Sequence, residues 1–416
     1  MGKSSRLRCG KKPLRSNAWG AFLRSFCTRG VCFFASISAL TLGEEAGGQK
    51  VGDLVAVLAF DLGVKEGMND PFSSLKTLLD TPFDMIIDVR APLEFAEDHI
   101  PGAINLPVLN DLERAEVGTI YKQQSPFLAR KLGAAMVARN AATHIEGPLA
   151  DKNGGWQPLV YCWRGGQRSN SFASILKQIG WRVEVLEGGY KTWRRLVVEA
   201  LYDHALPYRI VLLDGNTGTA KTNILQRVAA KGGQVLDLEG LAHHRGSIFG
   251  TMGTQPSQKG FETALAAALA RLDPHRPVLV EAESSRIGAR NLPSMLWAAM
   301  CDAPRIEVSA SLPARAGYLA EAYADLVADR DLMDQRLDQL VSLQGHERID
   351  AWRALAQAGA FVDLAEALMA YHYDPRYEKS RARYGHEVLE KIDLLDMSAR
   401  AREMAAERII ARLKAL

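Results

Sequence analysis

The sequence lacks the features that mark secreted, membrane-spanning and metal-stabilised proteins. Its five cysteines are scattered and odd in number, and no pair has the spacing of a disulfide framework or a zinc site. The apolar run at 31–42 is too short to span a bilayer. No internal repeat or low-complexity tract is present. These absences predict a cytoplasmic protein without a membrane anchor.

Acidic residues are missing from the first 43 positions, which carry eight Lys or Arg. Removing those eight from the formal net charge of +3 leaves the rest of the chain at about −5. An RNA site must therefore be a local basic patch rather than a property of the whole surface. We expect residues 1–67 to be a poorly ordered extension, with Met68 as the usual start; a targeting leader is the alternative.

The chain is long enough for two domains, and its patterns predict the α/β class. We expect one α/β domain at 68–203, and at 204–416 a second, parallel α/β domain with a helical C-terminal region. In the first part, 83–90 and 159–161 are typical of buried strands, and 125–145 has helical spacing. The last helix is predicted to run from about 386 to 416.

Residues 159–169, Leu-Val-Tyr-Cys-Trp-Arg-Gly-Gly-Gln-Arg-Ser, are the stretch around which the chain is organised. A cysteine that ends a strand and precedes a glycine-bearing loop and a helix start is placed where backbone N–H groups stabilise a thiolate. Cys162 is therefore the predicted nucleophile. The loop residues expected to support it are Arg164, Gly165, Gly166, Arg168 and Ser169.

A second loop, at 215–222, follows the apolar strand predicted at 208–214 and opens a helix. Its length and its Lys-Thr ending match a P-loop, in which backbone N–H groups and one ammonium surround phosphate oxygens. Ala220 replaces the usual last glycine, so either the backbone is helical there or the loop is altered. The predicted phosphate-binding residues are Gly215, Asn216, Thr217, Gly218, Thr219, Ala220, Lys221 and Thr222.

Carboxylates follow two further predicted strands, at 234–238 and 277–284. Asp237, Glu281 and Glu283 could contact a polar substrate or Mg²⁺, or such a residue could only cap a helix. No metal site is predicted, because the adjacent His243 and His244 cannot both face one ion from regular structure.

The spacing from Cys162 to Arg168 leaves the chemistry open. A Cys-x5-Arg loop has the length found in cysteine phosphatases and is one residue longer than in many sulfurtransferases. A cysteine phosphatase or a sulfurtransferase is therefore one alternative function.

The motifs at 88–90, 94–95 and 99–105 resemble the opening signature of a rhodanese domain, and 183–190 resembles its closing strand and turn. Further motifs lie at 237–250, 255–258, 281–284 and 373–377. Together with the cysteine loop and the P-loop, they closely resemble the bacterial tRNA 2-selenouridine synthases over roughly 72–383. The resemblance implies a rhodanese-like domain at 68–203 and a P-loop NTPase-like domain at 204–416. A rhodanese-fold phosphatase or sulfurtransferase and a non-catalytic tRNA-binding scaffold are the alternatives.

The resemblance implies an enzyme, a transferase of selenium that replaces the sulfur of wobble 2-thiouridine in tRNA. Selenophosphate and geranyl diphosphate are then co-substrates, with an S-geranyl intermediate and therefore tRNA geranyltransferase activity, and Cys162 carries selenium as a selanyl adduct. The implied partners are tRNA and a selenophosphate-producing enzyme; no firm cofactor follows, with Mg²⁺ as an option. The basic residues near Cys162 that could meet RNA are Arg164, Arg168, Arg182, Lys191, Arg194 and Arg195.

Overall fold

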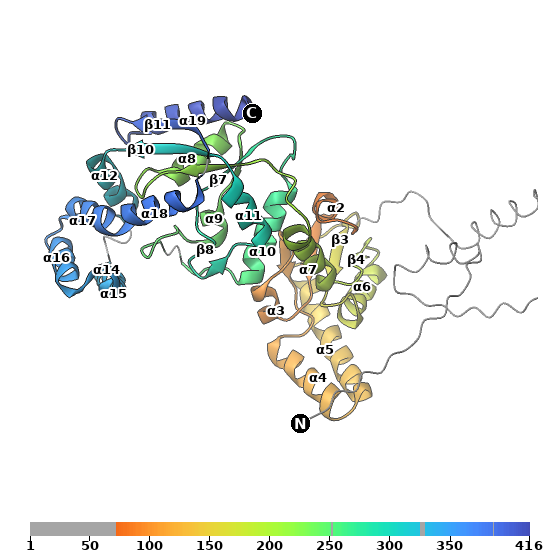
Figure 1. Cartoon of the computed structure of the whole chain (residues 1–416). Coiled ribbons are helices and arrows are strands. Elements are labelled where there is room, and N and C mark those ends of the chain that lie inside the picture. The colour runs from red at the N-terminus through yellow and green to blue at the C-terminus, as the bar shows by residue number, and fades with distance from the viewer. Residues whose placement is uncertain (1–71, 251–252, 325–328, 386) are drawn as a thin grey trace, which may run out of the picture. The chain divides into compact units, whose positions relative to one another are not determined.

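The computed structural model describes residues 72–250, 253–324, 329–385 and 387–416. The predicted N-terminal extension, 1–67, lies outside these residues. The described chain contains two parallel sheets, each flanked by helices (Figure 1). No helix in this part of the chain is both long and apolar enough to cross a membrane.

The first sheet has the strand order β2-β1-β3-β4 and is parallel throughout. Its strands are β1 (Met85–Asp88), β2 (Ala103–Asn105), β3 (Pro158–Tyr161) and β4 (Glu184–Val185). Its helices are α2 (Leu75–Asp80), α3 (Pro92–Glu97), α4 (Asp111–Gln123), α5 (Pro126–Glu146), α6 (Gln167–Ile179), α7 (Tyr190–Val198) and the π-helix η1 (Glu199–Asp203). Every residue of β3 is buried, as expected for a parallel strand covered on both faces.

The second sheet has the order β11-β10-β5-β7-β6 and is also parallel. Its strands are β5 (Ile210–Asp214), β6 (Gln234–Leu236), β7 (Val278–Glu281), β10 (Arg305–Ala310) and β11 (Val388–Leu394); β8 (Arg286–Ile287) and β9 (Arg290–Asn291) form a separate hairpin. Its helices are α8 (Lys221–Ala230), α9 (Leu238–Ala242), α10 (Gln258–Ala270), α11 (Ser294–Asp302), α12 (Leu312–Ala322), α14 (Arg330–Asp338), α15 (Val341–Gln344), α16 (His346–Gln357), α17 (Phe361–Leu368), the π-helix η2 (Met369–Tyr373), α18 (Asp374–Tyr384) and α19 (Ala399–Lys414). The central strand β5 is buried along its whole length and leads into the predicted P-loop.

The prediction of a single helix over 386–416 is wrong. Val388–Leu394 forms β11, which pairs with β10 at the sheet edge, and the helix α19 begins only at Ala399. Ile392 and Leu394 are buried and alternate with exposed Lys391 and Asp393, which is the period of a strand. Leu395, which follows β11 directly and falls inside the predicted helix, is 98% exposed.

The two sheets share a hydrophobic cluster. Helix α10 packs against α2 and α7, and α11 packs against η1. Trp193 of α7 and Phe261 of α10 are both fully buried in this cluster. The contact is mixed in character, because the Trp193 indole N–H also donates to the Thr263 hydroxyl at 3.3 Å.

Candidate active site

Cys162 directly follows β3, and α6 starts five residues later at Gln167. Its side chain is only 4% exposed, and its Sγ lies 3.2 Å from the Ser169 hydroxyl. Burial by itself raises the pKa of this thiol. Hydrogen bonds from the Ser169 hydroxyl and from the backbone N–H groups of Ser169, Arg164 and Gly166 outweigh burial, so the pKa lies below its usual value. The loop thus favours the thiolate by the N–H donors expected from the sequence.

The turn at 187–190 holds this loop from the side. Gly189 has φ +60°, and a Cβ there would lie 2.3 Å from the carbonyl oxygen of Cys162. That carbonyl accepts a hydrogen bond from the Tyr190 backbone N–H at 2.8 Å. Only glycine permits so close an approach of the two backbones, and the loop keeps its shape because of it.

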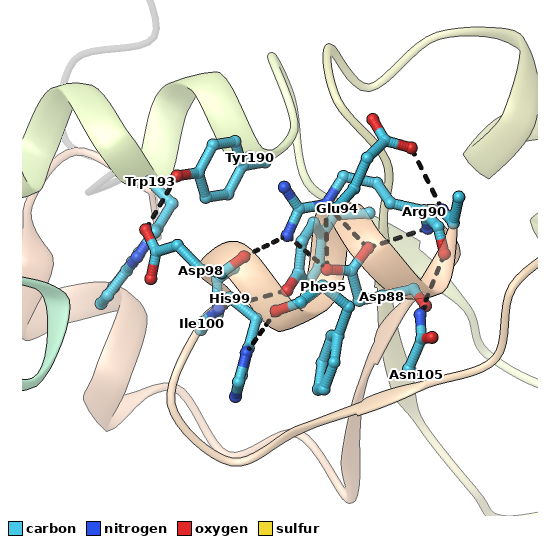
Figure 2. A network of polar contacts seen from close by, with 12 residues as sticks. Asp88, Arg90, Glu94, Phe95, Asp98, His99, Ile100, Asn105, Tyr190 and Trp193 are labelled. Carbon is cyan, nitrogen blue, oxygen red and sulfur yellow. Dashed lines mark hydrogen bonds and ion pairs between the residues drawn. The ribbon is translucent and has the colours of Figure 1, made fainter. Parts of the chain in front are cut away.

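A buried arginine supports the same region (Figure 2). Arg90 donates to both carboxylate oxygens of Asp88 and to the backbone carbonyl of Asp98, and its guanidinium lies 4.0 Å from the ring centroid of Tyr190. The Asp98 carboxylate accepts from the Tyr190 hydroxyl at 2.8 Å and from Thr263 of α10 at 3.0 Å. Burial raises the pKa of Asp98. This network ties the first turn of α7 to the neighbouring helix α10.

Three of the six basic residues predicted around Cys162 are engaged with carboxylates. Arg168 pairs with Glu94 at 2.7 Å, Arg194 with Glu262, and Arg195 with Glu199 at 3.2 Å. Arg164, Arg182 and Lys191 are exposed, and Arg182 donates to a backbone carbonyl at 3.4 Å. The catalytic loop therefore offers few unpaired cations to an RNA.

Replacing Ser169 by alanine is expected to raise the pKa of Cys162, because the variant loses the hydroxyl donor but keeps the backbone donors. Alkylation of Cys162 by iodoacetamide, followed by peptide mass spectrometry across pH, should therefore show its midpoint at higher pH than in wild type. Cys301, the other cysteine in the described part of the chain, gives the reference rate in each sample. An unchanged midpoint would show that the hydroxyl does not stabilise the thiolate.

The second loop connects β5 to α8, and Lys221 is the first residue of that helix. Its Nζ donates to the Gly215 carbonyl at 2.8 Å and lies 5.1 Å from the ring centroid of Tyr377. Burial by itself lowers the pKa of Lys221. The Tyr377 phenol and the nearby glutamates outweigh burial, and the pKa is raised. The ammonium of Lys221 therefore stays charged at the N-terminus of α8, as phosphate binding requires.

Ala220 adopts the left-handed conformation, with φ 58° and ψ 33°. The sequence left open a helical backbone or an altered loop, and the structure shows a third outcome, in which the residue keeps the positive φ that favours glycine and carries the strain of a Cβ. Ala220→Gly should therefore raise the free energy of unfolding by about 1 kcal/mol, since relief of the strain exceeds the entropy cost of glycine. Ala229→Gly, on the exposed face of α8, should instead lower it by about 1 kcal/mol. Urea unfolding of both variants tests this, and a destabilised Ala220→Gly protein would contradict it.

Two arginines missed by the sequence analysis hold the P-loop from the C-terminal side. Arg315 donates to the Thr217 carbonyl at 3.0 Å and forms a two-point pair with Asp374, at 3.0 and 2.8 Å. Arg381 donates to Asp214 at 3.1 Å and also to Asn216. The signal available in the sequence was the motif at 373–377, which contains Asp374.

The predicted carboxylates have different roles. Asp237 caps α9 by accepting a hydrogen bond from the Gly240 N–H at 2.7 Å. This is the helix-capping role that the sequence left open as the alternative to ligand contact. Glu281 is fully buried, and neither of its carboxylate oxygens has a hydrogen-bond partner among the described residues. Glu239, which the sequence analysis did not single out, accepts from the Thr222 hydroxyl at 2.9 Å. Burial and the charge of Glu239 raise the pKa of Glu283 to about 8. The carboxyl groups of Glu239, Glu281 and Glu283 therefore retain at least one proton between them near neutral pH, on the side of the P-loop.

The P-loop opens into a pocket of about 900 Å³. Its lining combines Lys221 and Thr222 with the carboxylates of Glu239 and Glu283 and the guanidinium of Arg376. A second, apolar pocket adjoins it, and the two share Thr217, Ser247, Leu319, Tyr323 and Tyr373. The other residues of the apolar pocket are Phe249, Ala320, Met333, Phe361, Leu364, Ala365 and Leu368. Among the described residues, no three His, Cys, Asp or Glu side chains are arranged to hold a metal ion.

Each of the two domains, with its loop, matches a known protein family. A rhodanese-like domain model matches 72–196, and a model described as the tRNA 2-selenouridine synthase AAA domain matches 208–347. A tRNA 2-selenouridine synthase of Alcanivorax borkumensis is 33% identical over 356 residues, which cover 77% of this chain and 95% of that protein. The chain belongs to the tRNA 2-selenouridine synthase family.

Other members of the tRNA 2-selenouridine synthase family are similar to this chain over most of their length. The protein of that name from Pseudomonas syringae pv. tomato is 34% identical over 331 residues, covering 71% of this chain and 88% of its own. That from Psychromonas ingrahamii is 38% identical over 255 residues, covering 61% and 68%. The resemblance seen in the motifs and the predicted order of a rhodanese-like and a P-loop-like domain are thereby confirmed.

Proposed function

We propose that this chain is a tRNA 2-selenouridine synthase that exchanges the sulfur of wobble 2-thiouridine for selenium from selenophosphate, through an S-geranyl intermediate made from geranyl diphosphate. One observation carries the proposal. This family member has both a cysteine whose pKa is lowered by hydrogen bonds from its loop and a P-loop beside an apolar pocket. The two loops correspond to the two chemical steps.

The P-loop pocket supports the geranylation step. Lys221 and the loop N–H groups suit a diphosphate, and the pocket of about 900 Å³ has room for a ten-carbon chain attached to it. The adjoining apolar pocket, at about 60 Å³, would take only part of that chain. In this step the sulfur of 2-thiouridine attacks C1 of the geranyl group. The carbon–oxygen bond to the diphosphate breaks, and the charged leaving group stays against Lys221.

The cysteine loop supports the selenium step. We propose that the Cys162 thiolate attacks C2 of the geranylated base, so that the carbon–sulfur bond to the geranylthio group breaks and geranylthiol leaves with a proton from water. The selenium of selenophosphate then attacks C2 and displaces the Cys162 thiolate, and hydrolysis of the phosphorus–selenium bond releases phosphate and leaves selenium on the base. The base must be turned out of its stack to reach a thiol that is 4% exposed, as single-stranded loops permit. The engagement of Arg168 by Glu94 weighs against the phosphatase alternative, because that mechanism needs this arginine on the phosphate.

Magnesium is a further proposal. The Thr222 hydroxyl, with Glu239 and Glu283 beside it, offers oxygen donors of the kind that Mg²⁺ takes together with phosphate oxygens. Mg²⁺ commonly uses only one or two carboxylates, so a cluster of three acidic ligands is not required. Bound there, the ion would neutralise diphosphate charge.

The deciding experiment is nucleoside mass spectrometry of 2-thiouridine-containing tRNA incubated with the protein, selenophosphate and geranyl diphosphate. We expect 2-selenouridine to form, and S-geranyl-2-thiouridine when selenophosphate is omitted. Release of phosphate from aryl phosphates without any change in the tRNA would favour the phosphatase. Binding of tRNA without any chemistry would favour the scaffold.

A further inference from the structure

Helices α4 and α5 form an antiparallel pair whose tip is exposed and has no partner in the described chain (Figure 1). Their inner faces are packed: Gly133 of α5 lies against Val117 of α4, and Met136 and Val137 join the core of the first sheet. At the tip, Tyr121 is 56% exposed and Phe127 is 65% exposed. Exposed aromatic rings at a helix turn contribute nothing to the core, so another molecule is their natural contact.

The charge near the tip of this pair is of one sign. From 117 to 145 the sequence contains no Asp or Glu, in a chain whose part after residue 43 is net acidic. Lys122, Arg130, Lys131 and Arg139 are exposed there, and none of them makes an ion pair within the described residues. Three of the six cations near Cys162 are paired, so the α4–α5 tip adds a second unpaired basic surface on the same domain.

The hairpin is fixed to the edge of the sheet that carries the catalytic loop. The α3 residue Leu93 donates its backbone N–H to Asp111, at the start of α4, at 3.1 Å. Asn140 of α5 donates to Glu113 of α4 at 2.8 Å, and Glu94, the residue after Leu93 in α3, pairs with Arg168. The 13 residues of α4 then place the tip about 20 Å from this edge, at 1.5 Å rise per residue.

We propose that the α4–α5 tip binds the tRNA at a distance from the modified base, with Lys122, Arg130 and Lys131 on phosphates and Tyr121 and Phe127 against unpaired bases. This inference rests on the proposed function, which supplies an RNA whose wobble base lies at Cys162. Cations interleaved with exposed aromatics suit phosphates and base faces. A protein partner is the poorer fit, because lysine is depleted from protein–protein interfaces.

The test is a charge-reversal variant, Lys122→Glu, Arg130→Glu and Lys131→Glu, measured for tRNA binding by fluorescence anisotropy at several salt concentrations. We expect affinity to fall about 100-fold at low salt and the slope of log K against log salt to decrease by roughly 2–3, because three phosphate contacts are lost. The matched control is Arg271→Glu, Arg400→Glu and Lys414→Glu, three exposed cations elsewhere with the same total change in charge. The control should bind tRNA within about threefold of wild type.

A second measurement needs no variant. In wild-type protein, bound tRNA should protect Lys122 and Lys131 from acetylation while leaving Lys414 reactive. If wild type binds tRNA but the tip variant binds equally well and neither lysine is protected, the surface assignment is wrong while the proposed function stands. If wild type itself fails to bind tRNA at any salt concentration, the proposed function and this inference fail together.

Discussion

Cys162→Ser is expected to abolish 2-selenouridine formation while leaving geranylation intact, so that S-geranyl-2-thiouridine accumulates in the tRNA. Serine preserves the size of the side chain and can accept the same N–H hydrogen bonds. Its hydroxyl does not ionise near neutral pH, so the nucleophile of the selenium step is lost and the rate should fall below detection. Nucleoside mass spectrometry of the tRNA after a timed incubation measures both products at once.

The geranylated intermediate is the internal control of this experiment. Its accumulation shows that the variant is folded, binds tRNA and performs the step assigned to the P-loop. Selenouridine formation at an undiminished rate would remove Cys162 from the chemistry. Loss of both products together would mean instead that the two steps are not separable in the way the two loops suggest.

Residues close together in sequence allowed the two loops to be predicted. Cys162 and Ser169 lie within one strand-loop-helix unit, and so do Gly215 and Lys221, so a local pattern contains the whole donor set. The same reasoning succeeded for α5, whose spacing over 125–145 matches the observed Pro126–Glu146. Local order in these units follows from propensity and from the burial of a continuous apolar strand.

Contacts between distant residues were not predictable in this way. The pairing of Arg168 with Glu94 joins positions 74 residues apart, and Arg315 meets Asp374 across 59 residues. Both sets of charges look from sequence like solvent-exposed or substrate-binding groups, and only the fold shows which charge neutralises which. The strand β11 was not predicted for a related reason. Apolar residues spaced four apart are compatible with both a helix and a strand, and here the pairing with β10 decides for the strand.

Lys221→Ala should produce the opposite defect to Cys162→Ser. Its ammonium is the cation that the P-loop brings to the diphosphate, and removing it leaves the leaving group stabilised by backbone N–H groups alone. We expect kcat/KM for geranyl diphosphate to fall by roughly 100-fold or more, as for loss of a preorganised charge at a developing anion. Formation of S-geranyl-2-thiouridine from 2-thiouridine tRNA is the quantity to measure.

The same variant should still convert tRNA that already carries S-geranyl-2-thiouridine into selenouridine tRNA, since this substrate bypasses the step that needs a diphosphate. Lys414→Ala, an exposed lysine on α19, is the matched control and should match wild type on both substrates. If Lys221→Ala instead loses activity on the geranylated tRNA but keeps geranylation, the P-loop serves selenophosphate, and the assignment of the two phosphate compounds to the two loops must be exchanged. Because each variant is tested on both substrates, the direction of the defect identifies the loop that serves each step.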